Sequence, residues 1–453
     1  MLRVFQRLSS ERWFLSILAL ALLLPLGLSR VKETVFLGLP RITSGDEPHY
    51  LVMINSLLND GDLDLDNDYL SARRGGFELG PGRAGAPLDR HVEYYSADGK
   101  PYGWSEVFQY PRSEHARPGE VPPIPELKPG ARRDFIGRAQ YSQHPPGLAV
   151  LLAPALYPVR GTRWVEHLAV LLSALATFAL ALGVRELFRL VSRDSGIVNA
   201  ATLVTVLGSP LWHYGRTLYT EPWLALFAVL ALALVLRRNA YFLAGCSIAL
   251  GMQMKPPFAL VALPLLIDRA LARDLRRAFL FSLPIAGSVA LVLVENQHFF
   301  GSPLRSAQPW VNGNLLSGMA GLLLSWNHGL IPFAPAVVVA LFGWRDLFRS
   351  HQRAAWLFAG TFASYYLLMS LWPIWRGGYC YGPRLIVPII PFAFLGLARV
   401  FESLPERSAR FRRGVAMTCG LSLGISAAGA LIHLAFWNNH PLVAPLILLS
   451  KQL

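Results

Sequence analysis

The sequence predicts an all-α protein that crosses a membrane many times, and three observations support this fold class. Of the 453 residues, 53% are hydrophobic and only 15% are charged, whereas soluble proteins carry about 25% charged residues. Apolar runs of spanning length recur along the whole chain. Clusters of arginine follow alternate runs, which is typical of loops that face the cytoplasm.

The basic charge fits the same interpretation. Lysine and arginine number 42 against 28 acidic residues, a net charge of +14. In a soluble protein this excess would indicate a nucleic-acid partner, but here short cytoplasmic loops account for it. We therefore predict membrane lipids and no nucleic acid as partners. The three cysteines are scattered and exclude a disulfide framework.

The N-terminal segment, 1–30, is predicted to be a cytoplasmic end followed by a first span. Arg3, Arg7 and Arg12 precede an apolar run at 13–28. That run resembles the apolar part of a signal peptide, but no small-residue cleavage site follows it. We interpret it as a retained span with the N-terminus in the cytoplasm.

A long polar segment, 31–163, is predicted to be a large first loop on the periplasmic side. It begins with a helix-like stretch at 46–58, and its middle, 71–140, is rich in Gly, Pro and Arg. Its last apolar run, 145–159, has 15 residues including four prolines. A run this short is interpreted as interfacial or re-entrant, since crossing would move every later arginine cluster to the other side.

The rest of the chain is predicted to form a helical bundle, 164–436, and a periplasmic tail, 437–453. The predicted spans are 164–184, 196–214, 219–236, 240–254, 256–268, 278–297, 329–343, 354–372, 384–402 and 414–436. With the first span this gives about 11 transmembrane helices. The N-terminus is then cytoplasmic and the C-terminus periplasmic.

Acidic residues at the outer ends of two spans are candidate site residues: Asp46 and Glu47 are the catalytic candidates, and Glu221 is a candidate for binding an acceptor, a sugar or a metal ion. Asp46 and Glu47 lie in TSGDEPHYL, 43–51, and Glu221 lies in LYTEPW, 218–223. A carboxylate there can accept a proton from a hydroxyl nucleophile, hold a divalent cation or orient an acceptor. Both motifs also fit an ordinary helix start, with an acid in the first turn.

Isolated cations at the outer ends of spans are candidate phosphate ligands. Lys255, Arg376 and Arg384 are the predicted donor-phosphate group, and Lys255 has no acid near it in the sequence. Cations close to the membrane need an anionic partner, which a phosphate supplies. The alternative is that each side chain extends to lipid headgroups. For Arg216 this alternative is as well supported as a functional role.

Three further side chains are candidates for binding an acceptor, a sugar or a metal ion. Tyr381 lies in the Trp-, Tyr- and Gly-rich stretch 371–384, where aromatic rings near an arginine would suit a sugar phosphate. His49 and His144 could bind metal or sugar, although single histidines are often structural. The acidic run 60–68 alternates like a calcium loop, but it lacks the Gly and Glu of that motif and also fits a solvated turn.

Taken in order, these motifs resemble the GT-C glycosyltransferases, within them the protein mannosyltransferase and lipid A aminoarabinose transferase group. The resemblance covers most of the chain in span order and motif placement. Supporting runs are the acidic pair after the first span, the HPPG return, GRTLYTEPWLALF (215–227), AGCSIALGMQMKPPFALVALPLL (244–266), FFGSP (299–303) and the YGPR turn.

The resemblance implies an inverting hexosyl- or pentosyltransferase of the bacterial inner membrane, with its active site facing the periplasm. Its donor would be a polyprenyl-phosphate-linked sugar, and its acceptor a lipid, a glycan or a protein. Asp46 matches the first-loop acid, the base or acceptor-orienting residue, and Lys255 matches a lysine near the donor phosphate. Two positions depart from the family: Gln143-His144 stands where a lysine is common, and Glu221 where several members have Asp.

Three other functions stay open. A non-catalytic assembly protein would tolerate Asp46→Asn with little loss of function. A lipid or sugar transporter (flippase) would place its charged residues near mid-membrane in repeated halves, whereas here they collect at one face. A lipid-linked glycan polymerase or ligase would share the outer arginines but would use a diphosphate donor.

Overall fold

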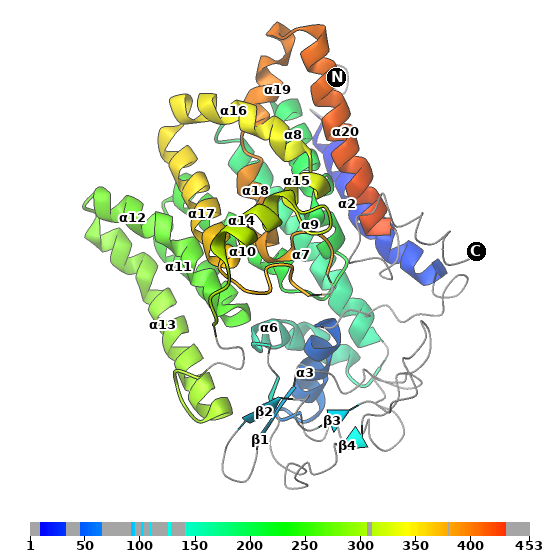
Figure 1. Cartoon of the computed structure of the whole chain (residues 1–453), viewed down its shortest axis with the longest axis vertical. Helices are drawn as coiled ribbons and strands as arrows, with labels where there is room; N and C mark the ends of the chain where they lie inside the picture. Colours follow the sequence, from blue (N-terminus) through cyan, green and yellow to red (C-terminus); the bar gives the residue numbers. More distant parts are fainter. Residues whose placement is uncertain are drawn as a thin grey trace. The chain divides into compact units, whose positions relative to one another are not determined.

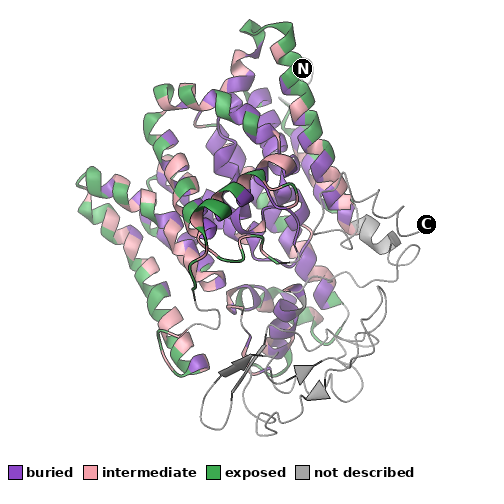
Figure 2. Ribbon diagram, in the orientation of Figure 1, coloured by how far each residue is buried: buried purple, intermediate pink, exposed green. Residues whose placement is uncertain are grey.

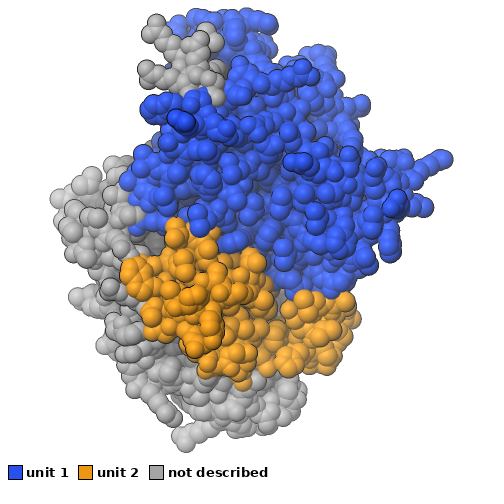
Figure 3. Space-filling view, turned by 180° about the vertical axis from the view of Figure 1, so that it is seen from behind, with its two compact units in different colours: residues 1–29, 173–288, 310–453 blue, residues 30–172, 289–309 orange. Residues whose placement is uncertain are grey.

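The structure is a computed structural model of the whole chain. It describes residues 10–32, 46–65, 144–162, 164–305, 310–378 and 380–431, together with short strands at 92–95, 101–103, 108–109, 126–127 and 141–142. The chain divides into two compact units, which are coloured separately in Figure 3. Unit 1 comprises residues 1–29, 173–288 and 310–453, and unit 2 comprises 30–172 and 289–309. The predicted domain boundaries at 30, 163 and 436 stay predictions.

In unit 1 the described residues form helices joined by loops, with no strand among them (Figure 1). Its elements are most of α2 (Glu11–Lys32), most of α7 (Trp164–Phe188), α8 (Ser195–Leu207), α9 (Pro210–Tyr214), α10 (Glu221–Arg238), α11 (Tyr241–Met254), η4 (Pro256–Ala262), α12 (Leu263–Leu271), the first half of α13 (Leu275–Phe300), α14 (Leu315–Leu324), α15 (Leu330–Phe333), α16 (Ala336–Ser350), α17 (Gln352–Ser370), η5 (Arg384–Ile389), α18 (Ile390–Ala393), α19 (Leu397–Ser403), η6 (Leu404–Glu406) and α20 (Ala409–Leu431).

Unit 2 combines two whole helices, the beginning of α7 and the end of α13 with short strands. Helix α3 (Glu47–Asn59) packs against α6 (Gly147–Leu156), which continues as η3 (Tyr157–Val159). The strands β1 (Val92–Tyr95), β2 (Pro101–Gly103) and β5 (Tyr141–Ser142) form an antiparallel sheet in the order β2-β1-β5. Strands β3 (Phe108–Gln109) and β4 (Glu126–Leu127) pair antiparallel.

The acidic run after α3 forms a hydrogen-bonded turn in its described part. Asp62 Oδ1 accepts hydrogen bonds from the Ser56 hydroxyl at 3.2 Å and from the backbone N–H of Asp64 at 3.1 Å. A carboxylate used in this way closes the turn locally. Residues 66–68 of the run lie outside the described residues.

Each predicted span interval contains helix. Four helical segments of the described chain are long and apolar enough to cross a membrane: 164–188, 275–300, 384–406 and 409–431. Helix α14 adds an apolar segment where no span was predicted. The number of spans and the sides of the two termini stay predictions.

Burial separates the interior of unit 1 from its periphery (Figure 2). Of the most apolar 18 residues of segment 384–406, 89% are buried inside the protein. Of the most apolar 18 residues of α13, only 11% are buried. An apolar helix with so little protein around it is suited to contact with lipid. Segment 384–406, by contrast, packs against α8, α10, α16 and α17, and its first residue is Arg384.

Helix α2 shows how the fold satisfies its backbone in an apolar setting. Pro25 has no N–H and therefore leaves the carbonyl of Ala21 without its usual helical donor. The indole Nε1 of Trp212 donates to this carbonyl at 2.9 Å. The carbonyl that the proline leaves without a helical donor thus receives a partner from α9.

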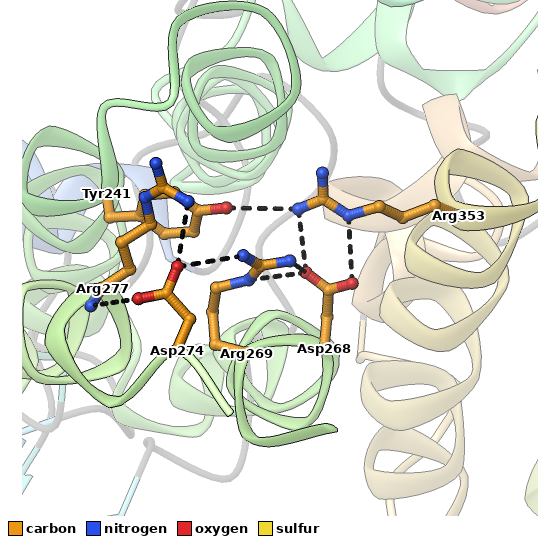
Figure 4. Close-up of polar contacts among 6 residues, drawn as sticks. All are labelled: Tyr241, Asp268, Arg269, Asp274, Arg277 and Arg353. Atoms are coloured by element: carbon orange, nitrogen blue, oxygen red, sulfur yellow. Dashed lines mark hydrogen bonds and ion pairs between the residues drawn. The ribbon is translucent and has the colours of Figure 1, made fainter. Parts of the chain in front are cut away.

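An ion-pair cluster joins α11, α12, α13 and α17 at the arginine-rich ends of these helices (Figure 4). Arg353 donates through Nε and Nη2 to both carboxylate oxygens of Asp268, at 3.1 and 2.9 Å, and through Nη2 to the Tyr241 hydroxyl at 3.2 Å. Its other members are Arg269, Asp274 and Arg277. The two-point contact fixes the orientation of the guanidinium group.

Candidate functional site

The acidic pair predicted from the sequence lies at the N-terminus of α3 in unit 2. Asp46 is the residue before the helix, and its backbone carbonyl accepts hydrogen bonds from His49 and Tyr50. Its side chain makes no capping hydrogen bond to the helix. Glu47 begins the helix and is buried. The helix-start interpretation therefore fits the position of Asp46, and its catalytic role stays a prediction.

The two histidine candidates come together in the same unit. His49 is fully buried on α3, and its ring centroid lies 5.9 Å from that of His144, just before α6. Tyr50 also contacts His144, with ring centroids 5.2 Å apart. The packing of α3 on α6 thus brings two motifs nearly a hundred residues apart in the sequence to one place.

In unit 1 the central residue is Glu221, at the first position of α10. Its side chain is 0% exposed. Oε1 accepts a hydrogen bond from Arg384 Nε at 2.9 Å and lies 3.8 Å from Lys255 Nζ. Oε2 has no hydrogen-bond partner among the described residues. A buried carboxylate requires cationic partners, and here two cations share one carboxylate oxygen.

Arg384 is held on three sides at the start of η5. Besides Glu221, it donates through Nη1 to the Gly377 carbonyl at 3.2 Å. Its guanidinium carbon lies 4.2 Å from the ring centroid of Tyr219, a cation–π contact. Gly377 and Gly382 of the preceding loop have φ of 76° and 59°, and glycine adopts this left-handed backbone at least cost. These turns bring the loop back so that Arg384 faces α10.

Lys255 lies at a break between two helical segments. Helix α11 ends at Met254, Lys255 is extended with φ −158° and ψ 97°, and Pro256 and Pro257 begin the 3-10 helix η4. Proline is favoured at the start of a helix and restricts the residue before it to extended backbone. The KPP sequence therefore produces the break that directs Lys255 to Glu221.

Two tyrosines of this site were not predicted. Tyr219 supplies the ring under Arg384, and Tyr365 of α17 is fully buried with a hydroxyl that has no hydrogen-bond partner among the described residues. Helix α17 packs against η5, which begins at Arg384. Tyr219 lies two residues before Glu221 and could have been noticed, whereas nothing in the apolar sequence around Tyr365 distinguishes it.

The remaining candidates, Tyr381 and Arg376, lie in the loop before η5. Tyr381 is buried, stacks on His213 at 4.2 Å between ring centroids and donates to the Ile425 carbonyl at 3.3 Å. Burial raises the pKa of its phenol. Arg376 is exposed and lies over the Trp375 ring. A sugar-binding role for Tyr381 and a phosphate-binding role for Arg376 stay predictions.

The described residues contain no group of three or more His, Cys, Asp and Glu side chains arranged to hold a metal ion. The candidate residues form two separate sets, each described within its own unit. Unit 2 contains Asp46, Glu47, His49 and His144, and unit 1 contains Glu221, Lys255 and Arg384 with their aromatic neighbours.

Comparisons with known proteins relate this fold to others. No protein-family model matches the sequence, and no curated protein matches it either. Two solved structures are similar, both of ArnT from Cupriavidus metallidurans: one in the apo state, the other bound to undecaprenyl phosphate. ArnT is a GT-C lipid A aminoarabinose transferase.

The similarity is extensive in fold and low in sequence. For apo ArnT it covers 87% of this chain and 61% of that chain, with 14% identity and a TM-score of 0.50. For the undecaprenyl phosphate complex it covers 96% and 78%, with 13% identity and a TM-score of 0.53. This chain thus corresponds to about three fifths of the apo ArnT chain. The likeness confirms, at the level of the fold, the resemblance drawn from the motifs: the chain has the GT-C fold of these ArnT structures.

Proposed function

We propose that this protein is an inverting GT-C glycosyltransferase of the bacterial inner membrane, with about 11 spans, a cytoplasmic N-terminus and a periplasmic C-terminus. It moves a hexose or pentose from a polyprenyl-phosphate-linked donor to a lipid, glycan or protein acceptor on the periplasmic face. The observation that carries this proposal is the junction of Glu221, Lys255 and Arg384, where two cations share one buried carboxylate. A solved structure of similar fold is bound to undecaprenyl phosphate, which supports a polyprenyl-phosphate ligand.

In this mechanism the cations act on the leaving group. The bond between the anomeric carbon and the phosphate oxygen breaks, and the electron pair stays with that oxygen. Lys255 and Arg384 stabilise the charge that develops on the phosphate, an effect that is strong where water is excluded. Arg376 is proposed to add a further contact from the loop before η5.

Asp46 is the proposed base. It accepts the proton of an acceptor hydroxyl as that oxygen attacks the anomeric carbon from the face opposite the phosphate, and the sugar is therefore inverted. Glu47 is proposed to assist Asp46 in accepting this proton. His49, His144 and Tyr381 are proposed to contact the acceptor or the sugar.

The test is sugar transfer by purified protein in lipid, from a radiolabelled mixture of polyprenyl-phosphate sugars to a panel of candidate acceptors. Wild type should consume a donor, and Asp46→Asn should reduce consumption by about a hundredfold or more, the contribution typical of a general base. Asp60→Asn, a carboxylate at the other end of α3, is the matched control and should retain activity.

Equal consumption by wild type and Asp46→Asn would move the base to another residue. If wild type consumed no polyprenyl-phosphate sugar with any acceptor, the glycosyltransferase assignment would be wrong. Use of a diphosphate-linked donor alone would identify a polymerase or ligase instead.

A further inference from the structure

We propose that Tyr214 is a positioning residue of the phosphate site. It holds the turn before Arg384 and the aromatic ring that lies against the guanidinium group, and it thereby sets the affinity for the donor phosphate. This inference rests on the proposed function and adds to it a residue that was not predicted from the sequence.

Tyr214 is the last residue of α9, a helix that is held on two sides. The ring nitrogen Nδ1 of His213 lies 2.9 Å from the Gly429 carbonyl of α20. On the other side, a Cβ on Gly215 would lie 2.7 Å from Thr177 Oγ1 of α7, so the chain after Tyr214 leaves no room for a side chain there. All residues of α9 are buried. A side chain packed in this way keeps one position, and Tyr214 can therefore act as a fixed support.

The first contact of Tyr214 is with the turn that leads to Arg384. Its hydroxyl donates a hydrogen bond to the Tyr381 carbonyl at 2.9 Å. That carbonyl belongs to the peptide before Gly382, whose φ is 59°. Since glycine adopts positive and negative φ at similar cost, Gly382 alone does not fix the orientation of this peptide. The Gly382 carbonyl in turn accepts from the backbone N–H of Arg384 at 2.9 Å. The hydroxyl of Tyr214 therefore fixes the turn from which Arg384 extends.

The second contact of Tyr214 is with the ring of Tyr219. The two ring centroids lie 5.5 Å apart at an interplanar angle of 82°, the edge-to-face arrangement that aromatic pairs favour. The Tyr219 ring centroid lies 4.2 Å from the guanidinium carbon of Arg384. Tyr214 thus supports Arg384 both through its backbone and through its aromatic neighbour. Because a guanidinium group binds phosphate through N–H groups in a fixed planar arrangement, its orientation determines the affinity for the phosphate.

The test is the binding of polyprenyl phosphate to purified Tyr214→Phe protein in lipid nanodiscs. This variant removes the hydroxyl and keeps the ring against Tyr219. Its affinity for polyprenyl phosphate should fall by about fivefold, the effect of one hydrogen bond. The KM for the sugar donor should rise by a similar factor, whereas the KM for the acceptor should not change. A merely structural role would lower the share of active protein, and hence kcat, and would leave the affinity of the remaining protein unchanged.

Two further variants separate positioning from a general effect on the fold. Tyr366→Phe removes a hydrogen bond of the same kind, to the Met319 carbonyl at 2.6 Å, and should keep the wild-type affinity for polyprenyl phosphate. Arg384→Lys keeps the positive charge but removes the planar guanidinium group. In the Arg384→Lys background, Tyr214→Phe should change the affinity by less than about twofold, because residues that act through one contact are not additive.

Wild-type affinity in Tyr214→Phe would overturn the inference, and so would a full fivefold loss that persists in the Arg384→Lys background. If wild type bound polyprenyl phosphate and transferred sugar in either case, the proposed function would stand without this role for Tyr214. If wild type bound no polyprenyl phosphate and transferred no sugar, both would fall.

Discussion

At the scale of single residues, the sequence locates charged groups but not their partners. Glu221, Lys255 and Arg384 were each predicted from an isolated charge at the end of an apolar run. Their pairing could not be predicted, since Arg384 is 163 residues from Glu221 along the chain. The ends of spans meet according to helix order in the bundle, which apolar periodicity does not encode.

The Tyr365 hydroxyl is expected to lower the stability of the protein and to strengthen its binding of the donor. Its buried hydroxyl has no partner among the described residues, and its helix α17 packs against η5, which begins at Arg384. Tyr365→Phe should raise the free energy of unfolding by about 1 kcal/mol, since it removes an unsatisfied polar group. It should also weaken donor binding by about fivefold, because the hydroxyl is expected to hydrogen-bond when the phosphate arrives.

The neighbouring tyrosine supplies the matched control for this prediction. The Tyr366 hydroxyl donates to the Met319 carbonyl at 2.6 Å. Tyr366→Phe should therefore lower stability by about 1 kcal/mol and leave donor affinity unchanged. Thermal unfolding and donor titration measure both quantities. A destabilised Tyr365→Phe with normal donor affinity would contradict the assignment of Tyr365 to the site.

His328 should make stability depend on pH. Burial lowers the pKa of its imidazole, the Gly382 carbonyl opposes that shift, and the Arg376 charge lowers the pKa further. The folded protein therefore binds this proton less readily than the unfolded chain. The ordinary pKa of histidine is 6.5. Above that pH, neutral His328 makes its full contribution to the free energy of unfolding, and this contribution is lost as the pH falls toward the lowered pKa of the folded protein.

Thermal midpoints measured at pH 7.5 and at about pH 5.5 check this dependence. The wild-type midpoint should drop more on acidification than that of His328→Gln, which cannot take up the proton. The same drop in both proteins would place the titrating group elsewhere.

At the scale of elements, breaks in helices create the site. KPP ends α11 and directs Lys255, and the turn glycines return the chain to Arg384. The sequence predicted an element in each span interval because an apolar run of that length has few other structures in a membrane. It did not predict that 384–406 begins as a 3-10 helix, nor α14, because short apolar segments look alike whether they are buried or spanning.

A pair of glycines should be essential where α16 and α19 meet. A Cβ on Gly343 would lie 2.0 Å from the carbonyl oxygen of Gly396, the residue before α19. Neither backbone can shift without disturbing its own helix, so Gly343→Ala should lower the free energy of unfolding by roughly 2–3 kcal/mol. The thermal midpoint in detergent measures the loss.

Gly414 of α20 is the control, since a Cβ there would meet nothing within 4 Å. Gly414→Ala should be neutral or stabilising by up to about 1 kcal/mol, because alanine favours the helix. A Gly343→Ala protein as stable as Gly414→Ala would contradict the close approach of the two backbones.

The ion pairs at the ends of α11, α12, α13 and α17 should contribute modestly. Arg353→Ala removes the two-point contact with Asp268 and the bond to Tyr241. The loss should be about 1 kcal/mol, because the Arg353 side chain is 46% exposed and solvent screens the pair. The difference from wild type should shrink in high salt. Arg349→Ala, at an exposed position of α16, should have no measurable effect in the same unfolding assay.

At the scale of the whole molecule, the composition was sufficient to predict the fold class but not to predict how the chain divides into compact units. Charge depletion and recurring apolar runs predicted a helical membrane protein, and the likeness to the ArnT structures confirms the GT-C fold. The division into two compact units was not predicted. Unit 2 joins residues 30–172 to the segment 289–309, through contacts such as Tyr141 with Phe299. Such long-range pairing leaves no local pattern in a single sequence.

The orientation of the chain in the membrane depends on whether the segment 145–159 crosses it. If 145–159 lies at the interface, the loop with Leu304 is periplasmic, the arginine-rich loop with Ser408 is cytoplasmic, and the tail with Ser450 is periplasmic. In a protein without its native cysteines, a membrane-impermeant maleimide added to intact cells should label Leu304→Cys and Ser450→Cys. Ser408→Cys should react only after the membrane is permeabilised. If 145–159 crossed instead, all three results would reverse together, and the proposed phosphate site around Glu221 would face the cytoplasm.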